Sequence, residues 1–268
     1  MRIVEYREVQ DSITARALRS ILAILFPWKT VQVTRGAWLS ILSALFPIVV
    51  ESRRQSAILA RQFYDEDRIN HGDIDRFDID LPDYEWDWFI NAMEPSYEAF
   101  VHGDMSDGQF AQTGLRAIKE VENAGRKELI KAVRDENSQT GSRVGWARVA
   151  TGRETCAFCL MLVSRGPVYE SREAADFSED TEKAMELLDQ GADKATLREL
   201  MTRWHPGCDC IAVPVRDISS WEGRDAWKEA EDIWYRTTKN FYGVDKLNAF
   251  RRAIERGEVS PQEFAIAA

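Results

Sequence analysis

The sequence predicts an α+β fold, with a mainly helical N-terminal half, a small α/β region clamped by cysteine and histidine, and C-terminal helices. Three observations lead to this prediction. Apolar residues recur at helical spacing through the first half, short β-branched segments follow after about residue 140, and all four cysteines lie in that second part. With 44% hydrophobic and 30% charged residues, the 268-residue chain is able to bury a core.

The first half is predicted to be helical along most of its length. A helix is expected over residues 7–26, because one face collects apolar residues, namely Val9, Ile13, Ala17, Ile21 and Ile24. A second helix is expected over 38–64, with a basic face made of Arg53, Arg54 and Arg61. Pro47 should bend or split it, since proline removes a helical hydrogen bond.

An acidic stretch follows the second helix. Ten carboxylates lie between Asp65 and Asp87, opposed only by Arg68 and Arg76, and this pattern is typical of a solvated, turn-rich segment. A calcium loop is the alternative interpretation. The stretch lacks the EF-hand order of acidic positions, central glycine and terminal glutamate.

Two further helices are expected before the chain changes character. They cover residues 86–100 and 106–134, and Ser106 or Asp107 is suited to cap the second. Residues 135–142 form a polar segment that we interpret as a linker and domain boundary.

The second half combines short strands with helices. The predicted strands cover 144–149, 167–169 and 211–215, and the predicted helices cover 179–202, 220–241 and 244–257. The chain therefore divides into a helical docking region (1–135), a cysteine/histidine-cluster domain (136–219) and C-terminal helices (220–268).

Charge and hydropathy narrow the class of protein. The net charge of −10 argues against a protein that coats nucleic acid, because phosphate binding needs dense lysine and arginine. No membrane-spanning segment is expected, since the most apolar run, Trp38 to Val50, is 13 residues long and contains Pro47. The N-terminus has no pattern of a signal peptide, so a reducing cytoplasm is the expected setting.

The four cysteines and one of the three histidines form a metal-type cluster. Cys156 and Cys159 have the Cys-x2-Cys spacing, and after 45 intervening residues His205, Cys208 and Cys210 follow as His-x2-Cys-x-Cys. A tight Cys-x2-Cys turn directs two thiolates to one ion, and zinc prefers sulfur and imidazole ligands. If Cys208 and Cys210 lie in a strand, both point to the same face and Asp209 points away.

Five candidate ligands compete for four places around a tetrahedral ion. Three thiolates with His205, or four thiolates with His205 behind them, both fit. A filled shell predicts a structural zinc site, because a catalytic zinc keeps one position open. Two disulfides, free buried thiols and redox catalysis are the alternatives.

The sequence shows no clear catalytic motif. The sequence contains neither His-Glu-x-x-His nor a deaminase pattern, a nucleophile elbow or a phosphate-binding loop. His102, Asp104 and Ser106 are triad residues by type, but they lie within five residues at a helix start, where capping is the better interpretation. We therefore assign no catalytic residue.

Three segments around the cluster carry a family resemblance. Residues 148–159 (RVATGRETCAFC), 164–169 (SRGPVY) and 205–215 (HPGCDCIAVPV) resemble the MuF-like minor capsid, or head morphogenesis, proteins of tailed bacteriophages, especially those of actinobacteria. Trp38 and residues 52–64 are similar to the helical front half of those proteins.

The resemblance implies a structural minor capsid protein of the virion. Such a protein lies inside the head, associates with the portal and the major capsid protein, and assists head assembly, DNA packaging or genome delivery after assembly in the host cytoplasm. The acidic balance argues against direct DNA contact. Two alternatives stay open: a capsid maturation protease, and a zinc-ribbon-like nucleic-acid adaptor that would use the basic helix face of Arg126, Lys127, Lys131 and Arg134.

Overall fold

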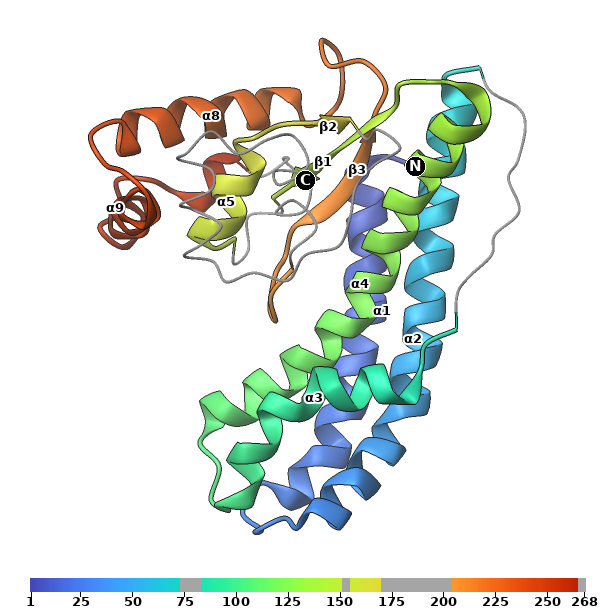
Figure 1. Cartoon of the computed structure of the whole chain (residues 1–268), viewed down its shortest axis with the longest axis vertical. Coiled ribbons are helices and arrows are strands. Elements are labelled where there is room, and N and C mark those ends of the chain that lie inside the picture. The colour runs from blue at the N-terminus through green and yellow to red at the C-terminus, as the bar shows by residue number, and fades with distance from the viewer. Residues whose placement is uncertain (73–82, 151–154, 170–203, 265–268) are drawn as a thin grey trace. The chain divides into compact units, whose positions relative to one another are not determined.

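The computed structural model describes residues 1–72, 83–150, 155–169 and 204–264 (Figure 1). The chain forms two compact units, one of residues 1–129 with 204–207 and one of residues 130–203 with 208–268. The boundary falls inside one long helix, α4 (Asp107–Thr140). The functional division of the chain at residues 135 and 219 stays a prediction.

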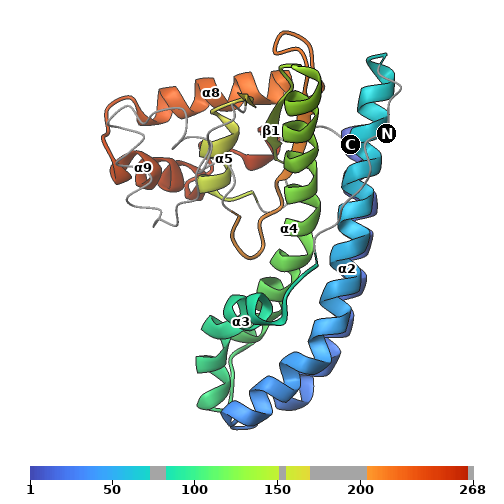
Figure 2. The ribbon, with the colours of Figure 1, turned by 45° about the vertical axis from the view of Figure 1, so that its right-hand side comes forward.

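The first unit is built from long helices. They are α1 (Ile3–Leu25), the short 3-10 helix η1 (Phe26–Trp28), α2 (Arg35–Asn70), α3 (Trp86–Val101) and the first part of α4. The helices α1 and α2 pack side by side as a hairpin in Figure 1, and in the turned view of Figure 2 α2 lies in front of α1. The α+β class is therefore confirmed, with its helical part at the N-terminus.

The helix α1 buries a face that differs slightly from the predicted one. Ile13, Ala17 and Ile21 are buried as expected, but Val9 is 46% exposed, so its assignment to the core was wrong. The buried face passes through Gln10 instead, because the Ser56 hydroxyl donates a hydrogen bond of 2.8 Å to the Gln10 side-chain oxygen. A polar side chain can be buried at this position since it has a partner.

The helix α2 runs unbroken past Pro47, so the predicted split is wrong. Its start is fixed by Thr34, whose hydroxyl accepts a hydrogen bond from the Ala37 amide at 3.3 Å. Pro47 has no backbone N–H to donate to the carbonyl of Ser43, four residues earlier in the helix. Both residues lie on the exposed side of the helix, where water can donate to that carbonyl instead. The opposite side is anchored by Trp38, Leu42, Leu45 and Val49, all fully buried.

Arg61 is not part of an exposed basic face, which corrects the prediction. Its side chain is 2% exposed and pairs with Asp65 at 3.1 Å and with Glu128 of α4 at 3.6 Å. Asp65 therefore belongs to the helical core and not to a solvated acidic segment. Residues 73–82, the middle of that acidic stretch, lie outside the described residues.

The helix α4 begins and ends with polar partners. At its start, the Ser106 amide donates to the Gln109 side chain at 3.0 Å and the Gln109 amide donates to the Ser106 hydroxyl at 3.2 Å, which forms a capping box.

The helix α4 continues to Thr140, so residues 135–140 are not a linker. Their polar side chains have partners: Arg216 donates to Glu136 at 2.7 and 3.0 Å, and Asn137 exchanges two hydrogen bonds with the backbone of Val144.

The described strands of the second unit form a three-stranded antiparallel sheet in the order β2-β1-β3. They are β1 (Gly145–Val149), β2 (Val168–Tyr169) and β3 (Ile211–Val215), which confirms the three predicted strands. The helices are α5 (Ala157–Val163), α8 (Arg224–Thr238), α9 (Val244–Glu255) and η2 (Pro261–Phe264). Both predicted C-terminal helices are confirmed with shorter bounds, and the predicted helix over 179–202 lies outside the described residues.

The helix α5 packs against α8 and α9 to form the core of the second unit. At its end Gly166 adopts a left-handed conformation with φ of +71° and lies directly against the ring of Trp227. The guanidinium of Arg165 lies 5.1 Å from the centre of the Trp234 ring, which in turn meets Phe250 edge-on. Aromatic contacts therefore join α5 to both C-terminal helices.

By length and composition, α2 is the described helix that could cross a membrane, with a mean hydropathy of 1.2 in its most apolar window. This evidence is weak, because the core helices of soluble proteins pass the same test. Of that window 28% is buried, and the exposed residues of α2 include the polar Ser40 and Ser43 as well as the apolar Ile69.

Replacing Gly166 by alanine should destabilise the second unit by about 2 kcal/mol or more. A Cβ atom there would lie 2.4 Å from the Trp227 ring, in addition to the strain of a positive φ. Gly257 is the matched control, because it has the same φ of +71° but nothing within 4 Å, so Gly257→Ala should cost only about 1 kcal/mol. Urea unfolding followed by tryptophan fluorescence measures both; equal losses would contradict the packing argument.

Candidate metal centre

The sheet register brings the two cysteine segments together. In the antiparallel pairing of β1 with β3, Val149 at the end of β1 lies opposite Ile211 at the start of β3. The Cys156 segment follows that end of β1, and Cys210 directly precedes Ile211. Both cysteine pairs therefore emerge at the same end of the ladder, although 48 residues separate Cys159 from Cys208 in sequence.

The first cysteine pair is organised by the start of α5. Cys156 is the N-cap of this helix, with an extended backbone, and its sulfur accepts a hydrogen bond from the Cys159 amide at 3.4 Å. The Cys-x2-Cys spacing thus matches one helical turn, which places both sulfurs at the helix N-terminus. The partial positive charge of that end favours bound thiolates.

Three of the sulfurs form a buried group. The sulfurs of Cys159, Cys208 and Cys210 all lie within 4.8 Å of one another, and Cys159 and Cys208 are 3.2 Å apart. Their side chains are buried, with at most 2% exposed, whereas Cys156 is half-buried. The four cysteines of the chain are free thiols in this arrangement.

Crowding and burial raise the pKa values of two of these thiols, Cys159 and Cys210. Hydrogen bonding with Cys156, then with Cys208 and Cys210, together with burial, raises the pKa of Cys159 well above its ordinary value. Hydrogen bonding with Cys159 lowers the pKa of Cys210, but Cys208 and burial outweigh it and raise that pKa as well. Thiols of this kind are poor nucleophiles, since reactive cysteines need a low pKa and exposure.

Cys208 and Cys210 do not lie in a strand, so strand geometry is not what brings their thiols together. Both belong to the loop that precedes β3, and their thiols nevertheless reach the same group. Asp209 between them has a role of its own, because both of its carboxylate oxygens accept from the Thr155 hydroxyl at 2.8 Å. This part-buried hydrogen bond ties the residue before Cys156 to the residue between the other two cysteines.

His205 is described with the first unit, to which residues 204–207 belong. It is half-buried, and its Nδ1 lies 2.9 Å from the carbonyl oxygen of Pro206. The neighbouring Trp204 carries the guanidinium of Arg126 over its ring at 4.3 Å. The candidate metal groups of the described chain draw on the four cysteines and on His205.

Comparison with known proteins gives the family. A family model described as VG15 protein matches residues 1–236. The chain belongs to the VG15 protein family. It is 36% identical to the Gene 15 protein of Mycobacterium phage L5, with both chains covered in full, and 36% identical to the Gene 15 protein of Mycobacterium phage D29, over 86% of this chain and 90% of that protein. No solved structure matches.

Membership of the VG15 family confirms the prediction that the chain is a bacteriophage protein. The resemblance to MuF-like head morphogenesis proteins stays a prediction. The match includes the whole metal centre, since residues 156–210 lie inside the matched range. The name Gene 15 protein states no activity. What the cysteine cluster can do chemically follows from the residues of this chain.

The structure does not assemble the triad-type residues of this VG15 protein into a catalytic group. The Ser106 hydroxyl donates to Gln109 at 2.9 Å as part of the helix cap, which confirms the capping interpretation. His102 ends α3 and, with Asp104, lines a cavity of about 650 Å³ in the first unit that Ser106 does not line.

The basic face of α4 is also interrupted, because Arg126 is 4% exposed and pairs with Glu122 at 3.2 Å.

Two parts of the candidate metal centre could not be found from the sequence. The helix α5 was not predicted, although the apolar run from Ala157 to Val163 is long enough for two helical turns. The bond between Thr155 and Asp209 was also missed, because nothing in the spacing shows that a hydroxyl 54 residues away will meet the carboxylate.

Replacing Thr155 by valine should destabilise the second unit by about 1.5–3 kcal/mol, because a hydrogen bond to a charged acceptor is lost. A double-mutant cycle of Thr155→Val with Asp209→Asn, measured by urea unfolding, isolates the pair. We expect the double variant to be clearly less destabilised than the sum of the two single variants. Strict additivity would contradict a direct clamp between the two segments.

Proposed function

We propose that this VG15 protein is a structural minor capsid protein of a tailed phage, with MuF-like character, inside the head and associated with the portal. The observation that carries the proposal is the relationship along the whole chain to mycobacteriophage gene 15 proteins. The resemblance of the segments around Cys156 and Cys208 to head morphogenesis proteins supports it. The proposed role is to assist head assembly, DNA packaging or genome delivery.

The cysteine cluster is proposed to hold a structural zinc ion. Three buried sulfurs within 4.8 Å of one another match the soft, tetrahedral ligand set that zinc prefers. Cys159, Cys208 and Cys210 would supply three ligands, and Cys156 or His205 the fourth. A bound zinc ion would supply folding free energy, because ligands that converge only in the folded chain couple metal binding to folding.

The proposed partners are the portal protein and the major capsid protein. Two features of the first unit support protein partners: Phe26 is 68% exposed at the turn between α1 and α2, and Trp88 is 55% exposed on α3. Aromatic side chains of this kind are enriched at protein interfaces. Contact with a bilayer is not proposed, because one described helix with the length and composition of a membrane span is weak evidence for one. DNA contact is not proposed either, since the chain is acidic.

Metal analysis tests the zinc proposal. Protein purified without chelators should contain about one zinc ion per chain, and Cys208→Ser should lose it and destabilise the second unit, because the ion's binding energy is folding energy. Inductively coupled plasma mass spectrometry and thermal unfolding measure the two effects. A fully folded, zinc-free protein would refute the proposal and favour free thiols or disulfides.

Two variants decide the fourth ligand. If His205 binds the ion, His205→Ala should weaken zinc affinity by roughly tenfold or more in a chelator competition, while Cys156→Ser changes it little. The reverse pattern would assign Cys156. His102→Ala is the matched control, because His102 is an exposed histidine outside the cluster.

Assembly experiments test the function itself. The full-length chain should co-purify with the portal protein of its own phage, and a deletion phage should yield heads that are empty, misassembled or non-infectious by electron microscopy and plaque assay. Normal infectious heads without the protein would overturn the proposal. Co-expression with the major capsid protein separates the protease alternative: a shortened capsid protein whose cleavage is lost in Ser106→Ala would favour an enzyme.

A further inference from the structure

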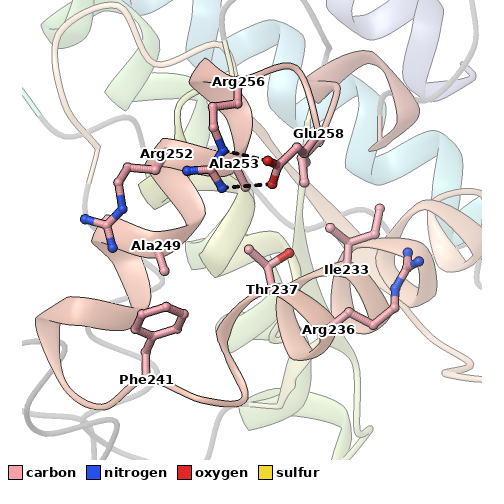
Figure 3. Close-up of a pocket in the computed structure, with 10 residues that line it drawn as sticks. Ile233, Arg236, Thr237, Phe241, Ala249, Arg252, Ala253, Arg256 and Glu258 are labelled. Atoms are coloured by element: carbon pink, nitrogen blue, oxygen red, sulfur yellow. Dashed lines mark hydrogen bonds and ion pairs between the residues drawn. The ribbon is translucent and has the colours of Figure 1, made fainter.

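We propose that a pocket between α8 and α9 binds an acidic segment of a partner protein that carries an apolar anchor side chain. The pocket lies wholly within the second unit and has a volume of about 560 Å³ (Figure 3). It is separate from the cysteine cluster, and none of its lining residues is a candidate metal ligand. The inference therefore does not depend on the zinc proposal.

The pocket combines an apolar floor with a cationic rim. Buried side chains of α8, α9 and the following turn contribute the floor, which consists of Ile233, Ala249, Ala253 and Val259. Three arginines stand around it, Arg236 from α8 and Arg252 and Arg256 from α9 and its end, as Figure 3 shows. Glu258 is the single carboxylate among the lining residues.

The three arginines differ in how far they are already neutralised. Glu258 accepts two hydrogen bonds from Arg256, at 2.6 and 2.9 Å, so this arginine is engaged. Arg236 pairs on its own helix with Asp232 at 3.1 Å and with Glu229 at 3.8 Å, but all three side chains are more than half exposed, and such pairs are weak. Arg252 makes no ion pair within the part of the chain that the structure describes. The pocket thus carries excess positive charge in a chain whose net charge is −10.

Helix direction leaves anion binding to the arginine side chains. Arg236 and Arg252 lie in the last turns of α8 and α9, where the helix ends carry partial negative charge. The pocket is therefore unlike phosphate sites that use backbone amides at a helix N-terminus. Arginine forms a paired fork with a carboxylate as with a phosphate, so the apolar floor is the feature that favours an acidic peptide with an apolar anchor.

An exposed aromatic residue in the pocket lining favours a protein as the source of that carboxylate. Phe241 lines the pocket and is 37% exposed, and Tyr242, which follows it in sequence, is 81% exposed. Tyrosine, phenylalanine and arginine are the residues enriched at the centres of protein interfaces. A nucleic acid would need cations spread along a surface, without a closed apolar floor.

A defined peptide tests the proposal. The probe is a fluorescein-labelled hexapeptide with four glutamates flanking a leucine and a phenylalanine, titrated with the full-length protein and followed by fluorescence anisotropy. We expect saturable binding that weakens with salt and is lost when the glutamates are replaced by glutamines. Arg252→Glu should weaken binding by roughly tenfold or more, and Phe241→Ala by about fivefold. Circular dichroism confirms that each variant is folded.

The matched control is Arg251→Glu. Arg251 is the exposed neighbour of Arg252 on α9, undergoes the same charge reversal, and does not line the pocket. It should change peptide binding less than about twofold. Equal losses for Arg251 and Arg252 would show general electrostatic attraction and overturn the pocket.

Three other outcomes also overturn the proposal. One is no saturable peptide binding up to about 1 mM, the weak end of specific recognition. Another is tight binding of a single-stranded oligothymidylate that Arg252→Glu abolishes, which would make the pocket a phosphate site. The third is self-association of the chain that the same variant abolishes in light scattering, which would make a second copy the occupant.

Discussion

The antiparallel pairing of β1 with β3 is the constraint on which the second unit depends. Val149, at the end of β1, pairs with Ile211, at the start of β3. This pairing fixes the position of the segment that leads from β1 to α5 relative to the Cys208–Cys210 loop that leads into β3. A slip by one residue would turn the side chains of β3 to the opposite face and move both cysteines away from Cys159. The hydrogen bond from Thr155 to Asp209 holds the same two segments from the other side. Two independent sets of contacts therefore specify the geometry of the thiol group.

Three buried thiols so close together are suited to a metal ion and poorly suited to redox chemistry. Burial and mutual hydrogen bonds raise the pKa of Cys159 and Cys210, so little thiolate is present without a cation. A divalent cation reverses this balance, because a coordinating thiol is deprotonated. The same crowding that suppresses nucleophilic reactivity thus provides a ligand set. The cluster is better understood as a connection between segments than as a reactive centre.

The fold class, the three strands and most of the long helices could be predicted from the sequence, because apolar periodicity and cap residues such as Ser106 are local properties. The errors arose where distant partners decide. Residues 135–140 look like a polar linker, yet Glu136 and Asn137 continue a helix because Arg216 and the Val144 backbone satisfy them. Arg61 looks like a surface cation, yet Asp65 and Glu128 bury it. The cysteine cluster was visible from spacing alone, but its dependence on Thr155, Asp209 and α5 was not.

The cluster and the arginine-lined pocket lie in the same unit and are joined by packing. The helix α5 starts at Cys156 and ends against Trp227, where Gly166 leaves no room for a Cβ atom. Trp227 belongs to α8, whose Trp234 meets Arg165 on one side and Phe250 of α9 on the other. Fixing the start of α5 therefore restrains the two helices that form the pocket, since close-packed interiors transmit displacement. A structural metal would then contribute to binding without touching the ligand, by holding α8 and α9 at a fixed separation.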